Sequence, residues 1–484
     1  MKKKIIFLVL VISFLWLISG VSNESEFINH LNRTIKSAEI FSLVETLSSP
    51  QYEGRLTGTT GYEKAVQLAA EQFKKYGIHP ITGDNTYTQS FPLSYTKVYE
   101  SKLIVHLQDK EGKQETLQCE YFKDYYPLNF SGSGNITGNI IFAGYGVTAP
   151  EFDYDDYKGI DVKGKIVMII KGVPKEKENE DWAAYDEHRF RTSNALKHGA
   201  SGLLYIYAGR GNPNGNYLQD FPMLSIEEKL ADRILEKYGK NVKTLTDQLN
   251  QRQNVSFATD VNVEIMVRSE NFQGSGSNVV GYIPGADELL RNEFIVVGAH
   301  LDHCGMWPQL TPGADDNASG SAALLAIAGA LGTSKYKPKR SVLFILFAGE
   351  EMGLFGSKYF VSHLPEKVKK INFVFNMDMV GAGPNVFILR LQNYPEVEKI
   401  LMETPRKLNL GCQIKGNKVT GKRRSGSDHA PFVEKGIPAV SVFSADGKHN
   451  GYHTNEDTIY WITPKITEDI AKIISYAVMR LASD

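Results

Sequence analysis

The sequence predicts an α/β fold, a three-layer sandwich with a mostly parallel central sheet, and a smaller domain inserted into it. From about residue 275 onward, short apolar runs alternate with loops and helical stretches, the pattern of strand–loop–helix units. Between about residues 110 and 260 this pattern gives way to short strands separated by turns rich in Gly, Asp and Tyr. The chain has 484 residues, more than one ordinary domain needs, which leaves room for such an insertion.

The N-terminal residues have the three parts of a secretory signal peptide, which we expect to span residues 1–22. Lysines at positions 2–4 form a positive region, an apolar run follows from Ile5 to Ile18, and small residues come next. An uncleaved membrane anchor is the alternative, but the run is short for a span, which needs about 20 residues. We therefore expect an exported protein, periplasmic or secreted. Its net charge of −1 gives no reason to expect nucleic acid or a membrane surface as partner.

The first part of the main domain is expected over residues 26–110. Its segment YEKAVQLAAEQFKKYGI repeats apolar residues at helical spacing, and Gly77 ends the predicted helix. The preceding GRLTGTTG matches neither nucleotide-binding motif, so we expect a structural loop. The inserted domain is expected over 111–260, with a helix beginning at a capping box formed by Ser225 and Glu228. Its DYDDY segment is interpreted as an exposed acidic turn, because the spacing is not that of a calcium loop.

The catalytic part is expected over residues 261–484, where strands and helices alternate. The predicted strands are Asn278–Ile283, Phe294–Ala299, Val342–Ala348, Phe373–Met377 and Ala439–Phe443. The predicted helices are Ser319–Leu331, Gly353–Phe360 and Pro464–Leu481. In an open α/β sheet, ligands bind at the carboxyl ends of the strands, so reactive side chains are expected there.

Five residues with metal-binding side chains lie in this part, nearly all at the ends of its apolar strands. They are His300, Asp316, Glu351, Asp378 and His453. Two imidazoles and three carboxylates suit zinc or a similar divalent ion. A catalytic zinc takes three protein ligands and a water, so five side chains are too many for one ion. If one carboxylate bridges, they can hold two zinc ions about 3.5–4 Å apart.

Asp316 is the natural bridge, because its loop lies between the strand that ends at His300 and the strand that precedes Glu351. We assign His300 and Asp378 to one zinc ion. Glu351 and His453 are assigned to the other.

The adjacent carboxylates Glu350 and Glu351 follow an apolar strand, and neighbouring side chains of an extended chain point in opposite directions. Glu351 can therefore bind a metal while Glu350 faces the bridging water. We expect Glu350 to take a proton from that water and pass it to the leaving amine. Asp302, two residues after His300, can orient the imidazole through its other nitrogen.

The remaining histidines and the cysteines are expected to lie outside the ligand set. His303 and His449 lie near ligand segments but have no coordination position left to fill, and His429 is expected to support the site or to contact substrate. Three cysteines are too few for a disulfide scaffold. They are Cys119, Cys304 and Cys412. Although Cys304 adjoins His303, we expect a free buried thiol there.

The strings GAHLDH, PGADDNASG, LFAGEEMGLFGS, NMDMVG, SGSDHAPF and GYHTNEDT together resemble the co-catalytic zinc aminopeptidases of the bacterial leucyl aminopeptidase and aminopeptidase Y type. The glutamate carboxypeptidases belong to the same superfamily. The resemblance covers about 275–484 well and 45–95 more loosely. It implies the five residues above as zinc ligands, with Asp316 rather than Asp315 as the bridge. It also implies Glu350 as general base, Asp302 as support for a ligand, and a cis peptide bond between Asp316 and Asn317.

The block 111–260 resembles the protease-associated domain, through GYGVTAPEFDYDDYKGIDVKGKIVMI and ALKHGASGLLYIY. The whole sequence therefore predicts an exported zinc-dependent aminopeptidase that hydrolyses N-terminal residues from peptide substrates. A dipeptidase or carboxypeptidase-type enzyme with the same metals is one alternative, with Arg423 and Arg424 as candidate partners of a substrate carboxylate. A non-catalytic, receptor-like binding protein on this fold is another, but such relatives have lost ligands and this chain has lost none.

Overall fold

The computed structural model describes residues 24–83, 86–108, 111–175, 177, 180–207, 211–306, 309–419, 426–449 and 451–483. The expected signal peptide, 1–22, lies outside the described residues, as do Arg423 and Arg424. Within the described ranges, no helix combines the length and the apolar character that crossing a membrane requires.

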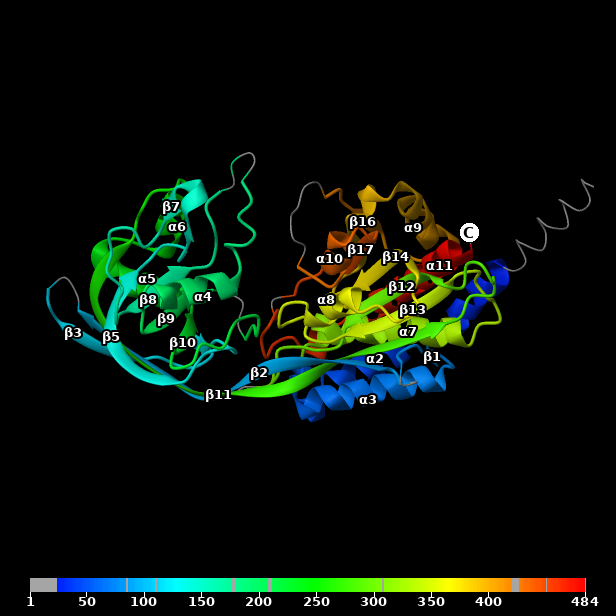
Figure 1. Ribbon diagram of the computed structural model, residues 1–484, viewed down its shortest axis with the longest axis horizontal. Helices are drawn as coiled ribbons and strands as arrows, with labels where there is room; N and C mark the ends of the chain where they lie inside the picture. Colours follow the sequence, from blue (N-terminus) through cyan, green and yellow to red (C-terminus); the bar gives the residue numbers. More distant parts are fainter. Residues whose placement is uncertain are drawn as a thin grey trace, which may run out of the picture.

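Two long antiparallel strands connect a larger and a smaller lobe (Figure 1). They are β2 (Thr88–Gln108) and β11 (Phe257–Ile283). The two strands pair from Val279 opposite Thr88 to Asn262 opposite His106, with a shift of register between Arg268 and Ser269. A register shift of this kind bends and twists a strand pair. One sheet therefore continues from the larger lobe into the smaller one.

The sheet of the larger lobe is mostly parallel, which confirms the predicted fold class. Its strand order is β16 (Ile414–Gly416), β15 (Asn385–Leu389), β17 (Ala439–Ala445), β14 (Lys370–Met377), β12 (Glu293–His300), β13 (Ser341–Phe347) and β11, and β1 (His79–Pro80) also pairs with β11. Strands β13, β12, β14 and β17 run parallel to one another. Every residue of β13 is buried, as expected for a parallel strand covered on both faces.

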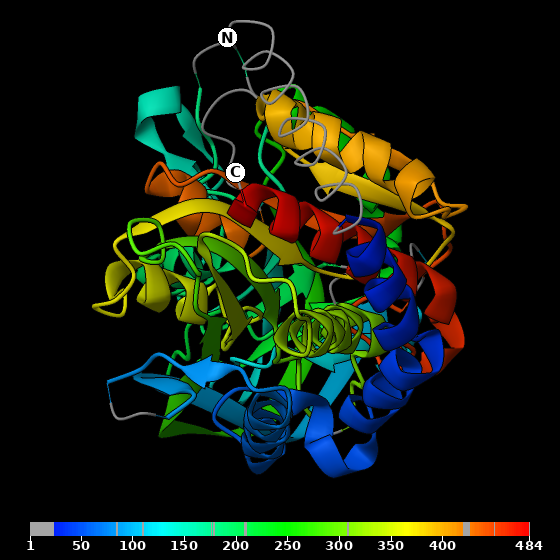
Figure 2. The same ribbon diagram turned by 90° about the vertical axis from the view of Figure 1, so that its right-hand side faces the viewer.

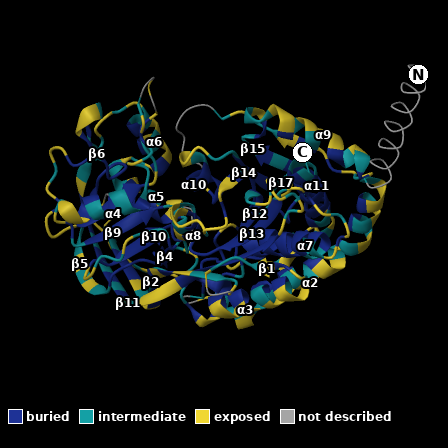
Figure 3. Ribbon diagram, turned by 45° about the vertical axis from the view of Figure 1, so that its right-hand side comes forward, coloured by how far each residue is buried: buried dark blue, intermediate teal, exposed yellow. Residues whose placement is uncertain are grey.

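Helices cover both faces of this sheet and complete the three layers. One face carries α2 (Ser37–Leu47), α3 (Thr60–Lys75), α7 (Gly320–Gly332), α9 (Pro395–Lys407) and α11 (Pro464–Ser483), and the other carries α8 (Phe355–Ser362) and α10 (His429–Glu434). The N-terminal helices (blue) and the C-terminal helix (red) lie side by side in Figure 2. Helix α7 is apolar almost all round and lies in the buried interior, shown dark blue in Figure 3.

The smaller lobe carries the continuation of this sheet and has its own hydrophobic core. It contains β3 (Gln114–Gln118), β4 (Tyr125–Pro127), β5 (Gly134–Phe142), β6 (Thr148–Ala149), β7 (Tyr154–Asp155), β8 (Ile166–Ile170), β9 (Gly202–Ile206) and β10 (Met223–Ile226), with helices α4 (His188–Lys197), α5 (Glu228–Leu235) and α6 (Val242–Asn250). Strands β5, β8, β9 and β10 are parallel, and buried apolar side chains cover the sheet.

Two local predictions for this lobe are wrong. Ser225 does not cap a helix: it lies in β10, where its hydroxyl donates to the carbonyl of Tyr207, and α5 begins only at Glu228. The DYDDY segment is not an exposed turn throughout, because Asp156 is buried. Its carboxylate accepts hydrogen bonds from the backbone amides of Tyr145 and Val147, and burial raises its pKa to about 7. At both positions, hydrogen bonds to residues outside the local segment decide the structure, and the sequence pattern does not.

Candidate metal centre

The strand ends bring all five candidate ligands together at the carboxyl edge of the larger sheet. His300 is the last residue of β12, Asp378 directly follows β14, and Glu351 follows β13 after a short turn. Asp316 lies in the helical turn Ala314–Ser319 that precedes α7, and His453 lies in the loop between β17 and α11. All five side chains are buried, with at most 8% of each residue exposed.

The ligand atoms form two groups that share Asp316. In the first, His300 Nε2 lies 3.3 Å from Asp316 Oδ1 and 3.3 Å from Asp378 Oδ1. In the second, His453 Nε2 lies 3.2 Å from Asp316 Oδ2 and 2.8 Å from Glu351 Oε2. Each group offers ligand atoms that lie within 4.8 Å of one another. One oxygen of Asp316 therefore faces each group, as a bridging carboxylate requires.

These residues fit a pair of divalent cations. Buried polar atoms in proteins are nearly always hydrogen-bonded. Yet neither Asp316 Oδ2 nor His453 Nε2 has a hydrogen-bond partner among the described residues, although the two atoms are only 3.2 Å apart. Three buried carboxylates around two imidazoles also need positive charge, and this donor set suits zinc. Cations at the two groups would supply both the missing partners and the missing charge.

The electrostatics of the centre show the same need for positive charge. Burial opposes the charge of His300, but the carboxylate of Glu350 and hydrogen bonds to Asp316 and Asp378 raise its pKa well above its ordinary value. Burial likewise opposes the charge of His453, but Glu351 and Asp316 raise its pKa to about 10. Without metal, protons on these imidazoles neutralise the carboxylates.

Two of those carboxylates remain ionised despite their burial. Burial acts to raise the pKa of Asp316, but the neighbouring imidazoles of His300 and His453 hold it well below its usual range. Burial and the charge of Asp316 act to raise the pKa of Glu351, and His453 with His303 lowers it to about 2. Ionised carboxylates are the form that binds a cation.

Glu350 lies beside the first group and lines an open cleft. Its carboxylate is partly exposed to that cleft, unlike the buried carboxylate of Glu351. Burial raises the pKa of Glu350 well above its ordinary value, although the charge of His300 opposes the shift. Both glutamates line the cleft, and Glu350 offers a ligand-type atom within 4.8 Å of His300 and Glu351, but Glu351 is the more deeply buried of the two.

Asp302 supports the centre mainly through the backbone that follows β13. Its carboxylate is fully buried and accepts hydrogen bonds from the backbone amides of Glu350, at 3.2 Å, and Glu351, at 3.4 Å. His300 Nδ1 lies nearer to the backbone oxygen of Asp302, at 3.2 Å, than to its carboxylate, at 3.8 Å. Asp302 thus contacts the imidazole as expected, and it also fixes the turn that carries both glutamates.

Asp457 holds the loop that carries Asp316, a role that the sequence did not indicate. Its carboxylate accepts hydrogen bonds from the backbone amides of Asp315, at 2.9 Å, and Asp316, at 3.0 Å. His449 Nε2 lies 3.0 Å from the same carboxylate, so His449 supports Asp457 rather than a metal. The predicted cis peptide bond between Asp316 and Asn317 is confirmed.

Asp315 turns away from the ligand groups. Its Oδ1 accepts hydrogen bonds from the backbone amide of Gly381, at 2.7 Å, and from the Ser319 hydroxyl, at 3.1 Å. On the other side of the centre, the Ser427 hydroxyl donates to Asp378 Oδ2 at 2.7 Å. His429 is buried and has no hydrogen-bond partner among the described residues, and burial lowers its pKa to about 3.

A cleft of about 260 Å³ opens over the centre, and both lobes line it. The larger lobe contributes Glu350, Glu351 and His453. It also contributes Tyr452, whose ring stacks on His453 with 3.8 Å between ring centroids. The smaller lobe contributes Glu187, Arg189, Asn212 and Asn214. This second wall could not be predicted from the sequence, because its residues follow no strand of the larger lobe.

Comparisons with known proteins identify a family and a fold that this chain resembles. Residues 278–478 match the sequence model described as Peptidase family M28. Leupeptin-inactivating enzyme 1 of Streptomyces exfoliatus is 36% identical over 173 residues, which cover 35% of this chain and 36% of that protein. Aminopeptidase YwaD of Bacillus subtilis is 25% identical over 352 residues, which cover 69% of this chain and 67% of that protein. The match thus spans only about a third of the length of the first of these relatives.

Among solved structures, the aminopeptidase from Aneurinibacillus sp. strain AM-1 superposes with a TM-score of 0.65 at 23% identity. The superposition covers 94% of this chain and 96% of that one. At this level of identity the likeness concerns the fold, and it extends over both lobes. The predicted architecture is therefore shared with a protein of nearly the same extent.

Proposed function

We propose that this chain, which belongs to Peptidase family M28, is a zinc-dependent aminopeptidase that removes N-terminal residues from peptides. The matched family agrees with the resemblance seen in the sequence motifs. The observation that carries the proposal is the pair of ligand groups that share Asp316, with Glu350 facing the cleft beside them. Relatives named aminopeptidases, matched over most of this chain, support the same activity.

The residues present assign a ligand set to each of two zinc ions. His300 and Asp378 would hold one, Glu351 and His453 the other, and Asp316 would bridge them. Such a pair supplies Lewis-acid polarisation of the scissile carbonyl and lowers the pKa of a bound water. The burial of every ligand keeps bulk water out of the ligand shell, which strengthens these electrostatic interactions.

Glu350 is the proposed general base. It lies next to a ligand, it reaches the cleft, and its raised pKa lets it hold a proton between taking it from water and giving it to the leaving amine. Tyr452 is a second proposed participant. About half of the residue is exposed, it lines the cleft and its ring stacks on His453, so its phenol, which is protonated at neutral pH, can donate a hydrogen bond to an oxyanion in the cleft.

The cleft suits a peptide with a free α-amine. Its lining has more acidic than basic side chains, which attracts a positively charged group: the acidic ones are Glu187, Glu350, Glu351 and Glu434, and the basic ones are Arg189 and Lys358. A carboxypeptidase-type reaction would instead need basic partners for a substrate carboxylate, and the candidates for that role, Arg423 and Arg424, lie outside the described residues. The acidic lining therefore favours the aminopeptidase.

We further propose the division of the chain expected from the sequence. Residues 1–22 are removed on export, 26–110 and 261–484 form the peptidase domain, and 111–260 form an inserted protease-associated domain. The separate core of the smaller lobe supports an inserted unit.

The Glu350→Gln substitution tests the function. It keeps the shape of the side chain and removes the base, so we expect kcat on an amino-acid nitroanilide to fall about 10²–10⁴-fold. Zinc content should stay at two per chain. The exposed Glu366→Gln is the matched control and should change neither quantity. Near-normal turnover of Glu350→Gln would refute the assignment of the base.

A substrate panel tests the substrate class. The wild-type protein should cleave a free-amine nitroanilide and leave its N-acetylated counterpart and an N-blocked dipeptide intact. Cleavage of the blocked dipeptide alone would establish the carboxypeptidase-type alternative instead.

A further inference from the structure

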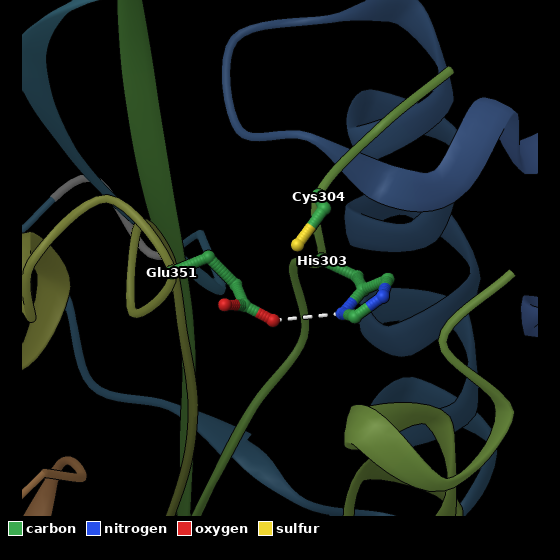
Figure 4. Close-up of side chains that lie close together, drawn as sticks. All are labelled: His303, Cys304 and Glu351. Carbon is green, nitrogen blue, oxygen red and sulfur yellow. Dashed lines mark hydrogen bonds and ion pairs between the residues drawn. The ribbon is translucent and has the colours of Figure 1, made fainter. Parts of the chain in front are cut away.

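We propose that His303 is a positioning residue for the second metal group: it occupies one oxygen of Glu351 and leaves only the other for a metal ion. The proposal rests on the proposed function, since it concerns the same centre. His303 Nδ1 lies 2.7 Å from Glu351 Oε1. Figure 4 shows the imidazole pointing its Nδ1 at the carboxylate, with the thiol of Cys304 nearby.

The two oxygens of Glu351 have different partners. Oε1 accepts the hydrogen bond from His303, whereas Oε2 lies 2.8 Å from His453 Nε2, which belongs to the ligand group. A carboxylate can only accept, so the proton of this hydrogen bond lies on Nδ1 of His303. With its proton committed to Glu351, Nδ1 has no lone pair for a metal. Glu351 therefore turns Oε2 to the ligand group, and Nδ1 of His303 is not available to a metal, while Nε2 of His303 has no hydrogen-bond partner among the described residues.

The position of His303 is fixed from several sides. The residue is fully buried, and its backbone amide donates to the carbonyl of Arg55 at 3.2 Å. Its ring packs against Gly313, where an added Cβ would lie 2.4 Å from the ring. The guanidinium of Arg55 donates to the carbonyl of Gly313 at 2.8 Å. Arg55 therefore holds both the backbone of His303 and the glycine that packs against its ring. A ring fixed in this way can hold the carboxylate of Glu351 in one orientation.

The neighbouring thiol offers a competing interpretation. His303, Cys304 and Glu351 each present a ligand atom within 4.8 Å of the others, so the three residues could hold a metal of their own. A thiol binds metals as the thiolate. Such a metal would have to displace the hydrogen bond between His303 Nδ1 and Glu351 Oε1, which are only 2.7 Å apart and already satisfy one another. The hydrogen-bonding role of His303 is therefore the better account of the cluster.

Metal affinity in three variants tests the proposal. Zinc is titrated into the metal-free protein against a chromophoric chelator. Loss of a residue that orients a ligand typically weakens metal binding 10–100-fold, so His303→Ala should weaken one of two zinc sites by about that factor. In His303→Asn the amide nitrogen can take the place of Nδ1, and most of the affinity should return. Cys304→Ser is the matched control at the adjacent buried position and should leave both sites unchanged.

Cobalt substitution adds a readout that packing alone would not move. The cobalt-loaded wild-type protein should show no thiolate charge-transfer band. Such a band, lost in Cys304→Ser, would overturn the proposal and make Cys304 a ligand. Unchanged affinities in His303→Ala, or an Asn variant as weak as the Ala variant, would also overturn it. A wild-type protein that binds no zinc would instead refute the proposed function, so the two failures are distinguishable.

Discussion

Replacing Asp457 by Asn should loosen the loop that carries the bridging ligand. The carboxylate of Asp457 accepts one backbone amide on each oxygen, at 2.9 and 3.0 Å, and it is fully buried. An Asn side chain keeps one oxygen as an acceptor for one of these backbone amides. Its NH2 group faces the other backbone amide and cannot accept a hydrogen bond from it. A hydrogen bond to a charged group contributes about 1.5–3 kcal/mol, and a buried donor left without a partner costs about 1–3 kcal/mol. We expect the substitution to lower the free energy of unfolding by about 2–4 kcal/mol.

Urea unfolding of the metal-free protein measures this loss directly. The chelator must be present, because bound zinc would stabilise the folded state by mass action and hide part of the effect. Asp446→Asn is the control, since Asp446 is exposed and pairs only with side chains at the surface. We also expect weaker zinc binding at both groups, because Asp316 belongs to both. An unfolding free energy within about 0.5 kcal/mol of wild type, with unchanged zinc affinity, would refute the role of Asp457.

Two further predictions concern the cleft wall and proton release. Arg189 donates to the carbonyl of Met352 at 2.5 Å and to Asn214 Oδ1 at 2.7 Å, so it joins the lobes beside Glu351. Arg189→Ala should raise KM several-fold with little change in zinc content. Arg233→Ala, at the surface of the same lobe, is the control and should leave KM unchanged. Equal KM values for Arg189→Ala and the wild-type protein would contradict this role. Zinc binding should release protons, because the pKa of His453 is raised to about 10 in the metal-free protein and a coordinating imidazole is neutral. Calorimetry at pH 8 in buffers of different ionisation enthalpy should give different apparent enthalpies, and identical enthalpies would rule the release out.

The raised pKa of His453 also makes the stability of the metal-free protein depend on pH. The folded-state pKa of His453 lies above its ordinary value, so its proton stabilises the metal-free fold at low pH. This contribution is complete below about pH 6.5, the ordinary pKa of histidine, and falls away as the pH rises toward the folded-state value of about 10. The pH dependence of zinc affinity runs the opposite way, because zinc and the proton compete for the same nitrogen.

The residues of the metal centre could be predicted because their positions follow from strand geometry. Buried parallel strands end at one edge of the sheet, so His300, Glu351 and Asp378 had to lie close together once β12, β13 and β14 were recognised. The full length of β11 could not be predicted in this way. Its segment from 268 to 277 pairs with β2 but is largely exposed, and the stretch SENFQGSGS lacks the apolar alternation by which a half-buried strand is recognised.

The supporting residues could not be predicted because their partners are remote in the sequence. Nothing in the string GYHTNEDT distinguishes Asp457, which binds backbone amides, from a residue that binds a metal. Likewise, a histidine next to a ligand segment offers no sign that its proton belongs to Glu351. Hydrogen bonds of this kind depend on how loops pack, and loop packing has no period in the sequence.

The N-terminal segment shows how far this packing reaches. The turn containing Gly54 and Arg55, expected to be a structural loop, contacts both ends of the loop that follows β12. The Arg55 side chain is fully buried and donates to the carbonyls of Leu301 and Gly313, and the Gly54 carbonyl accepts from Gly305. This loop starts after His300 and leads into Asp316, so a single guanidinium ties the segment beside one candidate ligand to the segment beside another. Burial lowers the pKa of Arg55 to about 10, yet the carboxylates of the centre keep it charged at neutral pH. The early residues are thus an energetic part of the metal centre, although they contribute no ligand to it.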